Sequence, residues 1–338
     1  MLRALRHWIT ARTTDAAILA APSFSPRALD RLGVLLERAG PHCPVVARHV
    51  AENMRALGLY TPEVHRAYFA RLGDHFAGAL HALRCAGSTQ AGPRSEFAQL
   101  LAQRIQLHDS VARLSAATAT GRGAILVGPH ISSYLLNLAR LNQKVPLTVY
   151  LRYSKDAGRR AAKQRWYQAS GVGWISEAAD AGGALGRLGR MAAALRAGQV
   201  LFITPDLPQK RAEGTPVRFF DREIYLPAGP AVLAERTGAP LFMLTARWVG
   251  AVQQLVVEGP CDVAAAAHGR AARQAAVHAR LQWFTAGFER FVRAAAPLWY
   301  LWGDKRWTRL LHGDERYSRS LADASSATPP PSRIAGVA

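Results

Sequence analysis

The sequence predicts an α/β protein with a mostly parallel central sheet flanked by helices, together with an N-terminal helical region. Two patterns indicate this fold class. Up to about residue 105 the apolar residues recur at helical spacing, after Ser, Thr and Pro at the expected helix starts. From about residue 120, short apolar segments of strand length alternate with amphipathic helical segments. We therefore expect a helical region at 1–105, an α/β domain at 106–312 and a disordered tail at 313–338.

Three helices are expected in the N-terminal region. The first begins at Ser25 and Pro26, where serine can cap the helix and proline fits its first turn. The second ends at Gly58, and the third begins at Thr61 and Pro62. We expect the apolar stripes of these helices to lie in the core. Their residues are Leu29, Leu32, Leu35, Leu36, Val46, Val50, Met54, Leu57, Val64, Tyr68, Leu72, Phe76 and Leu80.

Four strands and five helices are expected in the α/β region. Each strand candidate is a short apolar segment, and amphipathic segments lie between these candidates. The strands are expected at 124–127, 147–151, 199–204 and 240–248, and the helices at 132–142, 156–170, 182–197, 229–237 and about 268–294. The chain after Tyr317 is rich in Ser, Ala and Pro, a composition typical of disorder.

The positive charge of the chain is its most unusual bulk property. A chain of 338 residues with 49% hydrophobic and 20% charged residues can bury a full core, which argues against wholesale disorder. A net charge of +20 attracts polyanions such as nucleic acid, anionic lipid headgroups, acidic carrier proteins or phosphate-bearing cofactors. Only five of the 43 basic residues are lysine, so the codon bias of a GC-rich genome can explain much of this basicity. The charge alone therefore selects none of these partners.

The sequence predicts a cytoplasmic protein, either free or peripheral at the inner membrane. Cys43, Cys85 and Cys261 lack CxxC spacing, so they predict neither a zinc site nor a disulfide framework and fit a reducing compartment. The apolar patch within residues 1–24 is interrupted by Pro22, is too short to span a membrane and lacks a clear signal-peptide layout. We therefore expect no spanning helix and no bound metal.

Three polar residues follow separate strands of the predicted sheet. His130 lies just beyond the first strand, Arg152 ends the second and Asp206 follows the third. Ligands of α/β sheets gather outside the carboxyl ends of the strands, so these positions are candidates for one site. Each residue also has a purely structural interpretation: a hydrogen-bonded histidine, a surface cation and a turn-stabilising aspartate.

Several other chemistries lack their motifs. The chain contains no GxxxxGK[ST] phosphate loop, no HExxH metal motif and no GxSxG nucleophile elbow. The segment "GVGWIS" at 171–176 lacks the third glycine of a nucleotide-binding loop and follows no predicted strand. No nucleic-acid recognition module is evident, so charge is the only feature that favours such a partner.

Four segments in order carry a resemblance to a known family. "VGPH" at 127–130 is a strand leading to a histidine, and "VYLRY" at 149–153 is a strand followed by an arginine. The long segment "TPDLPQKRAEGTPVRFFDREIYLPAGPAVLAERTGAPLFMLTARW" at 204–248 and the aromatic "PLWYLWGDKRW" at 297–307 follow. Over about residues 45–310 the chain resembles the bacterial lipid A biosynthesis acyltransferase family, of lauroyl/myristoyl type, within the lysophospholipid-acyltransferase-like superfamily.

This resemblance implies acyl transfer from an acyl carrier protein or coenzyme A thioester to a hydroxyl or amine, without a bound cofactor. It also implies a His-x4-Asp/Glu dyad, in which the histidine removes a proton from the acceptor and the carboxylate holds the correct tautomer. His130 matches the histidine of that dyad. A base is needed because an alcohol is a weak nucleophile at neutral pH, and a nearby cation or amide would stabilise the tetrahedral oxyanion.

Leu135 stands where the acid of this dyad is expected. Leucine cannot accept a hydrogen bond from an imidazole, and losing the orienting charge of a serine-protease triad costs on the order of 10⁴ in turnover. Three explanations stay open: another group takes the role, the acceptor needs less activation, or the protein no longer catalyses. Candidates for the replacement group are Ser132, Ser133, Tyr134 and Asp206.

We expect His130 to be the base and Asp206 to orient a partner or bind polar groups of the acceptor. Typical family members carry an N-terminal membrane anchor, and its expected lack here, together with Leu135, suggests a relative diverted to a specialised metabolite. The alternative is a non-catalytic subunit of the same fold that binds acyl-carrier or lipid ligands. Expected partners are acyl carrier protein or acyl-CoA and an anionic membrane surface, but no nucleic acid. Contacts to substrate are expected from Arg152, Arg247, Ser133 and Tyr134, the two arginines binding anionic groups.

Overall fold

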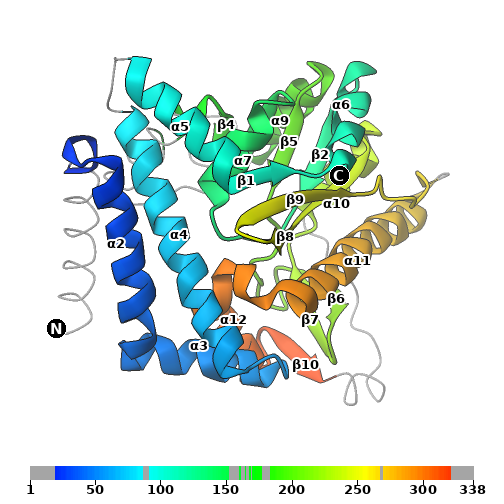
Figure 1. Cartoon of the computed structure of the whole chain (residues 1–338). Helices are drawn as coiled ribbons and strands as arrows, with labels where there is room; N and C mark the ends of the chain where they lie inside the picture. Colours follow the sequence, from blue (N-terminus) through cyan, green and yellow to red (C-terminus); the bar gives the residue numbers. More distant parts are fainter. Residues whose placement is uncertain are drawn as a thin grey trace.

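The computed structural model describes residues 20–86, 91–151, 160, 164, 167–168, 170–176, 183–266 and 269–320. It confirms the predicted fold class: a mostly parallel sheet is flanked by helices, and the N-terminal helices lie along one side of it (Figure 1). A second, smaller sheet lies beside the C-terminal helices.

The main sheet has seven strands in the order β1-β9-β8-β2-β5-β3-β4, and only the β8–β9 pair is antiparallel. The four predicted strands are β2, β3, β5 and β8, each within one residue of its expected limits. The sequence analysis missed β1, β4 and β9, and β4 is part of the "GVGWIS" segment. The strands are β1 (Ile105–Leu107), β2 (Ala124–Val127), β3 (Leu147–Leu151), β4 (Gly173–Ser176), β5 (Val200–Ile203), β8 (Leu241–Val249) and β9 (Val252–Glu258).

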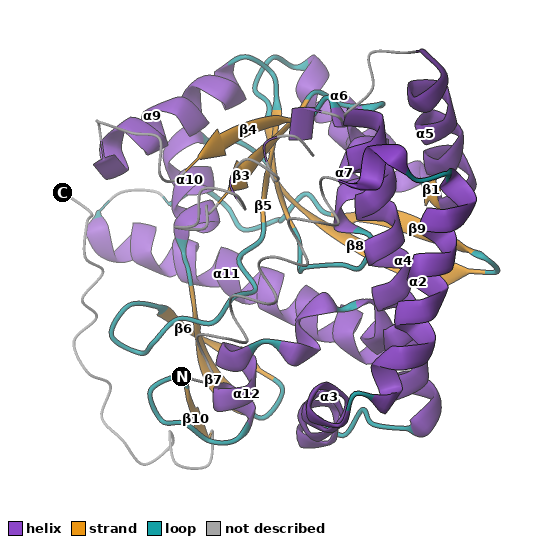
Figure 2. Cartoon of the chain, turned by 90° about the vertical axis from the view of Figure 1, so that its left-hand side faces the viewer, coloured by secondary structure: helices purple, strands orange, loops and turns teal. Residues whose placement is uncertain are grey.

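Helices cover both faces of this sheet (Figure 2). Helix α10 contacts both α9 and α11 on one face, whereas α5 and α7 pack on the other. Because both faces are covered, β2 and β5 consist entirely of buried apolar residues. The predicted helix at 156–170 lies largely outside the described residues. The helices of this region are α6 (Ala112–Ala119), α7 (Tyr134–Asn142), α9 (Gly183–Arg196), α10 (Gly229–Thr237), α11 (Arg270–Ala295) and α12 (Lys305–Leu311).

The N-terminal region forms the three expected helices and a further one before the sheet. They are α2 (Pro26–Ala39), α3 (Pro44–Ala56), α4 (Pro62–Ala86) and α5 (Ala91–Arg104). Ser25 caps α2 as predicted, because its Oγ accepts a hydrogen bond from the Ala28 N–H at 3.3 Å. Helices α2 and α4 approach closely at two glycines: a Cβ on Gly73 would lie 2.5 Å from the Gly33 carbonyl oxygen.

The prediction that all the apolar stripes lie in the core was wrong for part of α2 and its neighbours. Leu29 is fully buried, but Leu35 is 61% exposed. The reason is that α2 meets α4 through a narrow face around Leu29 and Gly33, which leaves the flanking leucines outside the contact. The other stripe residues found exposed are Leu32, Leu36, Val46 and Phe76.

The predicted disordered tail begins too early. Strand β10 (Ser318–Ser320) pairs with β7 (Arg222–Leu226), which also pairs with β6 (Thr215–Phe219). Tyr317 and Ser318 are buried, so the ordered chain continues at least to residue 320. The Ser/Ala/Pro composition that suggested disorder belongs mainly to residues 321–338, which lie outside the described part of the chain.

Among the described residues, no helix is both long enough and apolar enough to cross a membrane. Most of the N-terminal patch discussed above, residues 1–19, lies outside the description.

Candidate active site

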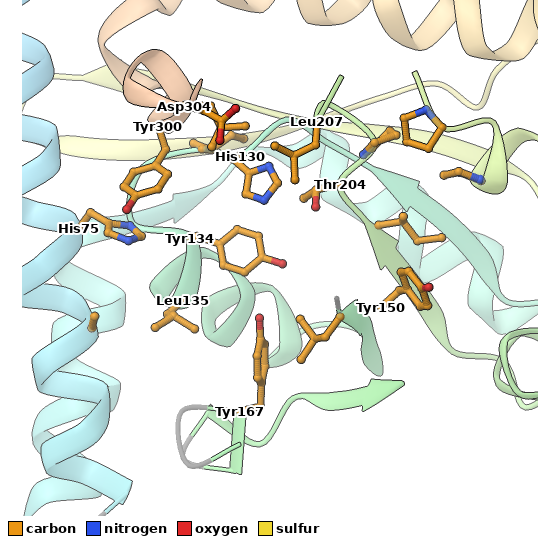
Figure 3. Close-up of a pocket in the computed structure, with 18 of the residues that line it drawn as sticks. His75, His130, Tyr134, Leu135, Tyr150, Tyr167, Thr204, Leu207, Tyr300 and Asp304 are labelled. Carbon is orange, nitrogen blue, oxygen red and sulfur yellow. The ribbon is translucent and has the colours of Figure 1, made fainter. Parts of the chain in front are cut away.

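A cavity of about 970 Å³ lies at the carboxyl edge of the main sheet, beside α4 and the start of α7 (Figure 3). Its described walls consist largely of apolar side chains from α4, α7, β3 and the loops that follow β2 and β5. His130 lines this cavity, whereas Asp206 lies fully buried behind it. The predicted location of the site at the strand ends therefore coincides with a real cavity.

The sheet register brings His130 and Asp206 together. Strands β2 and β5 are parallel neighbours in which Val127 is opposite Ile203. His130 and Asp206 each follow those paired residues by three positions, so the two loops leave the same edge side by side. The His130 Nδ1 lies 2.6 Å from the Asp206 Oδ1, and the His130 backbone N–H donates to the Asp206 Oδ2 at 2.7 Å.

Asp206 also accepts hydrogen bonds from two tryptophan side chains. Its Oδ2 also accepts from the Trp299 indole N–H at 3.2 Å, and its carbonyl oxygen accepts from the Trp307 indole N–H at 2.9 Å. A carboxylate surrounded by N–H groups favours the tautomer of His130 that carries its proton on Nδ1. The unprotonated Nε2 is then available to the cavity, and the ring is 26% exposed there.

The loop that carries His130 is fixed by the aromatic C-terminal segment. The His130 carbonyl oxygen accepts a hydrogen bond from the Tyr300 N–H at 2.9 Å, and the Ser132 N–H donates to the Leu298 carbonyl oxygen at 2.7 Å. Ile131 and Trp299 form an isolated antiparallel bridge between these hydrogen bonds. This explains why "PLWYLWGDKRW" accompanies the histidine motif: it positions both members of the pair.

Of the four candidates for the replacement acid, Asp206 alone forms a recorded hydrogen bond to the His130 ring among the described residues. Ser133 occupies the left-handed region with φ 59° and is buried, and the Ser132 Oγ is buried without a hydrogen-bond partner. The Tyr134 ring stacks near His130 at a centroid distance of 6.1 Å, and its hydroxyl shares a hydrogen bond with Tyr167. Burial raises the pKa of Tyr134 well above its ordinary value, so Tyr134 cannot supply a carboxylate-like charge.

Leu135 also lines the cavity, on the first turn of α7. Its side chain is 8% exposed and contributes apolar wall. The carboxylate bonded to the His130 ring therefore comes from the loop after β5, the neighbouring strand, instead of from the helix that follows the histidine.

The two predicted arginines have different outcomes. Arg152 lies outside the described residues. Arg247 is exposed, donates to the Gln254 Oε1 at 2.8 Å and is not among the residues that line the cavity. The long β8–β9 hairpin carries Arg247 toward solvent, and the described lining residues include no arginine or lysine.

The structure adds residues that the sequence analysis did not single out. Tyr300, Thr204 and Asp304 line the cavity close to His130 in Figure 3. His75 reaches the same cavity from α4. A signal for His75 exists in the sequence, because it shares one helical face with the predicted apolar stripe residues Leu72 and Phe76.

Comparison with known proteins decides the family. Residues 97–309 match the family model described as bacterial lipid A biosynthesis acyltransferase, and this span exceeds half of the chain. The chain belongs to the bacterial lipid A biosynthesis acyltransferase family. No match to a curated protein is found.

Membership in this acyltransferase family fits the geometry of the site. The matched span contains His130, Asp206 and the aromatic segment that holds them. Family membership supports acyltransferase activity in general, and the cavity lies where the predicted base meets its carboxylate.

Proposed function

We propose that this acyltransferase moves an acyl group from a carrier-protein or coenzyme A thioester to a hydroxyl or amine acceptor. The observation that carries the proposal is the His130–Asp206 pair, with Nδ1 bound to a buried carboxylate and Nε2 left for the cavity. An imidazole held in this way is a general base of the type that acyl transfer to an alcohol requires.

The reaction proceeds in two steps. The His130 Nε2 takes the proton of the acceptor O–H or N–H while the acceptor atom bonds to the thioester carbonyl carbon. The tetrahedral intermediate then breaks its carbon–sulfur bond, and the His130 imidazolium returns the proton to the departing thiolate. Asp206 stabilises the transient imidazolium through its hydrogen bond to Nδ1, the role that the aspartate of a serine-protease triad has.

The apolar part of the cavity suits the acyl chain of the donor. Ala79, Leu80 and Leu83 on α4 and Leu135 on α7 line it away from His130. Each methylene buried there contributes about 0.8 kcal/mol. The proposed substrate is therefore a thioester of a long hydrocarbon chain, with its carbonyl group near His130.

Charge and exposed apolar side chains support a cytoplasmic protein that works at a surface. The proposed donors, an acidic carrier protein or the phosphate-bearing coenzyme A, are among the polyanions that a net charge of +20 attracts. Leu35 on α2 and Val45 on α3 are 61% and 65% exposed, and we propose that these apolar side chains contact the membrane surface.

Intact-mass spectrometry of a loaded carrier protein tests the proposal. The carrier is charged with lauroyl or myristoyl groups, and lauroyl-CoA is compared as the donor, with 1,2-octanediol as the hydroxyl acceptor. We expect one of these donors to lose its acyl mass with the wild-type protein and to keep it with the His130→Ala variant. Donors that stay fully loaded under every condition, or equal loss with both proteins, would contradict the proposal.

The Leu135→Glu variant tests two alternatives: either Asp206 has replaced the missing acid of the dyad, or the site has lost its acid and no longer catalyses. Because Asp206 already bonds to Nδ1, a second acid has no orienting role, and a carboxylate in an apolar wall is unfavourable. We expect a loss of activity of about tenfold or more and a lower melting temperature, with Leu135→Met as the volume-conserving control. A large gain in turnover would instead support a degenerate, non-catalytic subunit.

A further inference from the structure

A second imidazole in the cavity wall has no role in the proposed reaction. His75 lies on α4 and lines the cavity together with His130 (Figure 3). The two residues are separated by 55 positions in the sequence, so only the packing of α4 against the sheet edge brings them to one cavity.

The position of His75 is tied to that of His130 through Tyr300. The His75 and Tyr300 rings lie 4.6 Å apart between centroids. The Tyr300 N–H donates to the His130 carbonyl oxygen at 2.9 Å, and the Tyr68 hydroxyl of α4 donates to the Tyr300 carbonyl oxygen at 3.2 Å. His75 is therefore held at a defined place beside the candidate base.

The Nδ1 of His75 is buried and has no hydrogen-bond partner in the described part of the chain. A buried polar atom without a partner is unfavourable and uncommon in folded proteins. Burial, with a smaller contribution from His130, lowers the pKa of His75 to about 4, so the ring is neutral at pH 7. A neutral imidazole offers one hydrogen-bond donor and one acceptor, and binds polar groups without requiring them to be charged.

The other α4 residues that line the cavity are apolar, so packing on this side of the cavity does not require a polar side chain. Ala79 and Leu83 follow His75 at intervals of four residues, and Phe76 and Leu80 lie beside them. All four are apolar. The one polar side chain of this row stands at the end nearest Tyr300 and the His130 loop, where the polar part of a substrate would lie.

We propose that His75 is a substrate-binding residue that exchanges a hydrogen bond with a second polar group of the acyl acceptor. This inference rests on the proposed function, in which His130 activates the first polar group. The acceptor class that fits is an amphipathic molecule with two polar groups, a diol or an amino alcohol, on an apolar body. A molecule with a single hydroxyl bound to His130 would make no hydrogen bond with the His75 imidazole.

Calorimetric binding of two matched alcohols tests this inference without requiring turnover. The probes are 1,2-octanediol and 1-octanol, which differ by one hydroxyl. We expect the wild-type protein to bind the diol about tenfold more tightly, because the second hydroxyl exchanges a hydrogen bond with the His75 imidazole. His75→Phe is expected to remove this preference, and His75→Asn, which keeps a hydrogen-bonding amide, to retain part of it.

Equal affinities in the wild-type protein, or an undiminished preference in folded His75→Phe, would overturn the assignment. If His75→Phe does not fold, as judged by its melting transition, His75→Leu takes its place. The proposed function is judged separately by consumption of lauroyl thioester, which His130→Ala should abolish while it retains the preference for the diol. Undiminished thioester consumption by His130→Ala would refute the proposed function, and the diol measurement would still decide the role of His75.

Discussion

The Asp206→Asn variant is expected to lose on the order of 10⁴-fold in acyl-transfer turnover, the loss seen when the orienting carboxylate of a serine-protease triad becomes an amide. The amide nitrogen donates where the carboxylate accepted, so the His130 ring adopts the tautomer with its proton on Nε2. That nitrogen can then no longer take a proton from the acceptor. Steady-state release of thiol from the thioester donor measures the effect.

Two comparisons make this prediction specific. Asp221→Asn removes an equal charge from a side chain that is 82% exposed and should leave turnover unchanged. Asp206→Asn should still bind the acyl chain, because the apolar wall is intact. Near-normal turnover in folded Asp206→Asn would show that the carboxylate does not orient the base.

The His130→Ala variant is expected to lower turnover by about 10²–10⁴-fold, the usual contribution of a general base. The fold should persist, because the ring is partly exposed in the cavity and Asp206 keeps its hydrogen bonds from Trp299 and the backbone. Added imidazole can occupy the vacated space and is expected to restore part of the rate. Unchanged turnover, or a loss of rate matched by unfolding in the melting transition, would contradict the assignment.

Much of the fold could be predicted because apolar periodicity reports directly on burial. The strands at 124–127 and 147–151 were predicted to the residue, since buried parallel strands are continuous apolar segments between turn signals. The sequence could not show in the same way that Asp206 is the partner of His130. Three other candidates, Ser132, Ser133 and Tyr134, lie nearer to His130 in the sequence. The contact between Asp206 and His130 depends on β2 and β5 being neighbours in the sheet, and that pairing joins residues 76 positions apart.

Tertiary packing also explains where the sequence predictions failed. Residues with the same local pattern can be buried or exposed, depending on which other elements pack against them. Leu29 and Leu35 belong to one apolar stripe, yet the narrow contact with α4 buries only the first. Arg247 lies near the end of an apolar strand, but β8 continues past it into the β8–β9 hairpin, where Arg247 pairs with Gln254 and is exposed. The helical pattern of α4 places His75 on the buried face, but it cannot show that this face reaches the site, because the neighbouring Tyr300 comes from the other end of the chain.

The central claim is that His130 and Asp206 act as one catalytic unit. A double-mutant cycle measures this directly through the turnover of His130→Ala, Asp206→Asn and the double variant. Residues that act as a unit have strongly non-additive effects, so the double variant should be no slower than His130→Ala alone. If the two residues act independently, the loss of turnover in the double variant should equal the product of the losses in the two single variants. That result would contradict the claim.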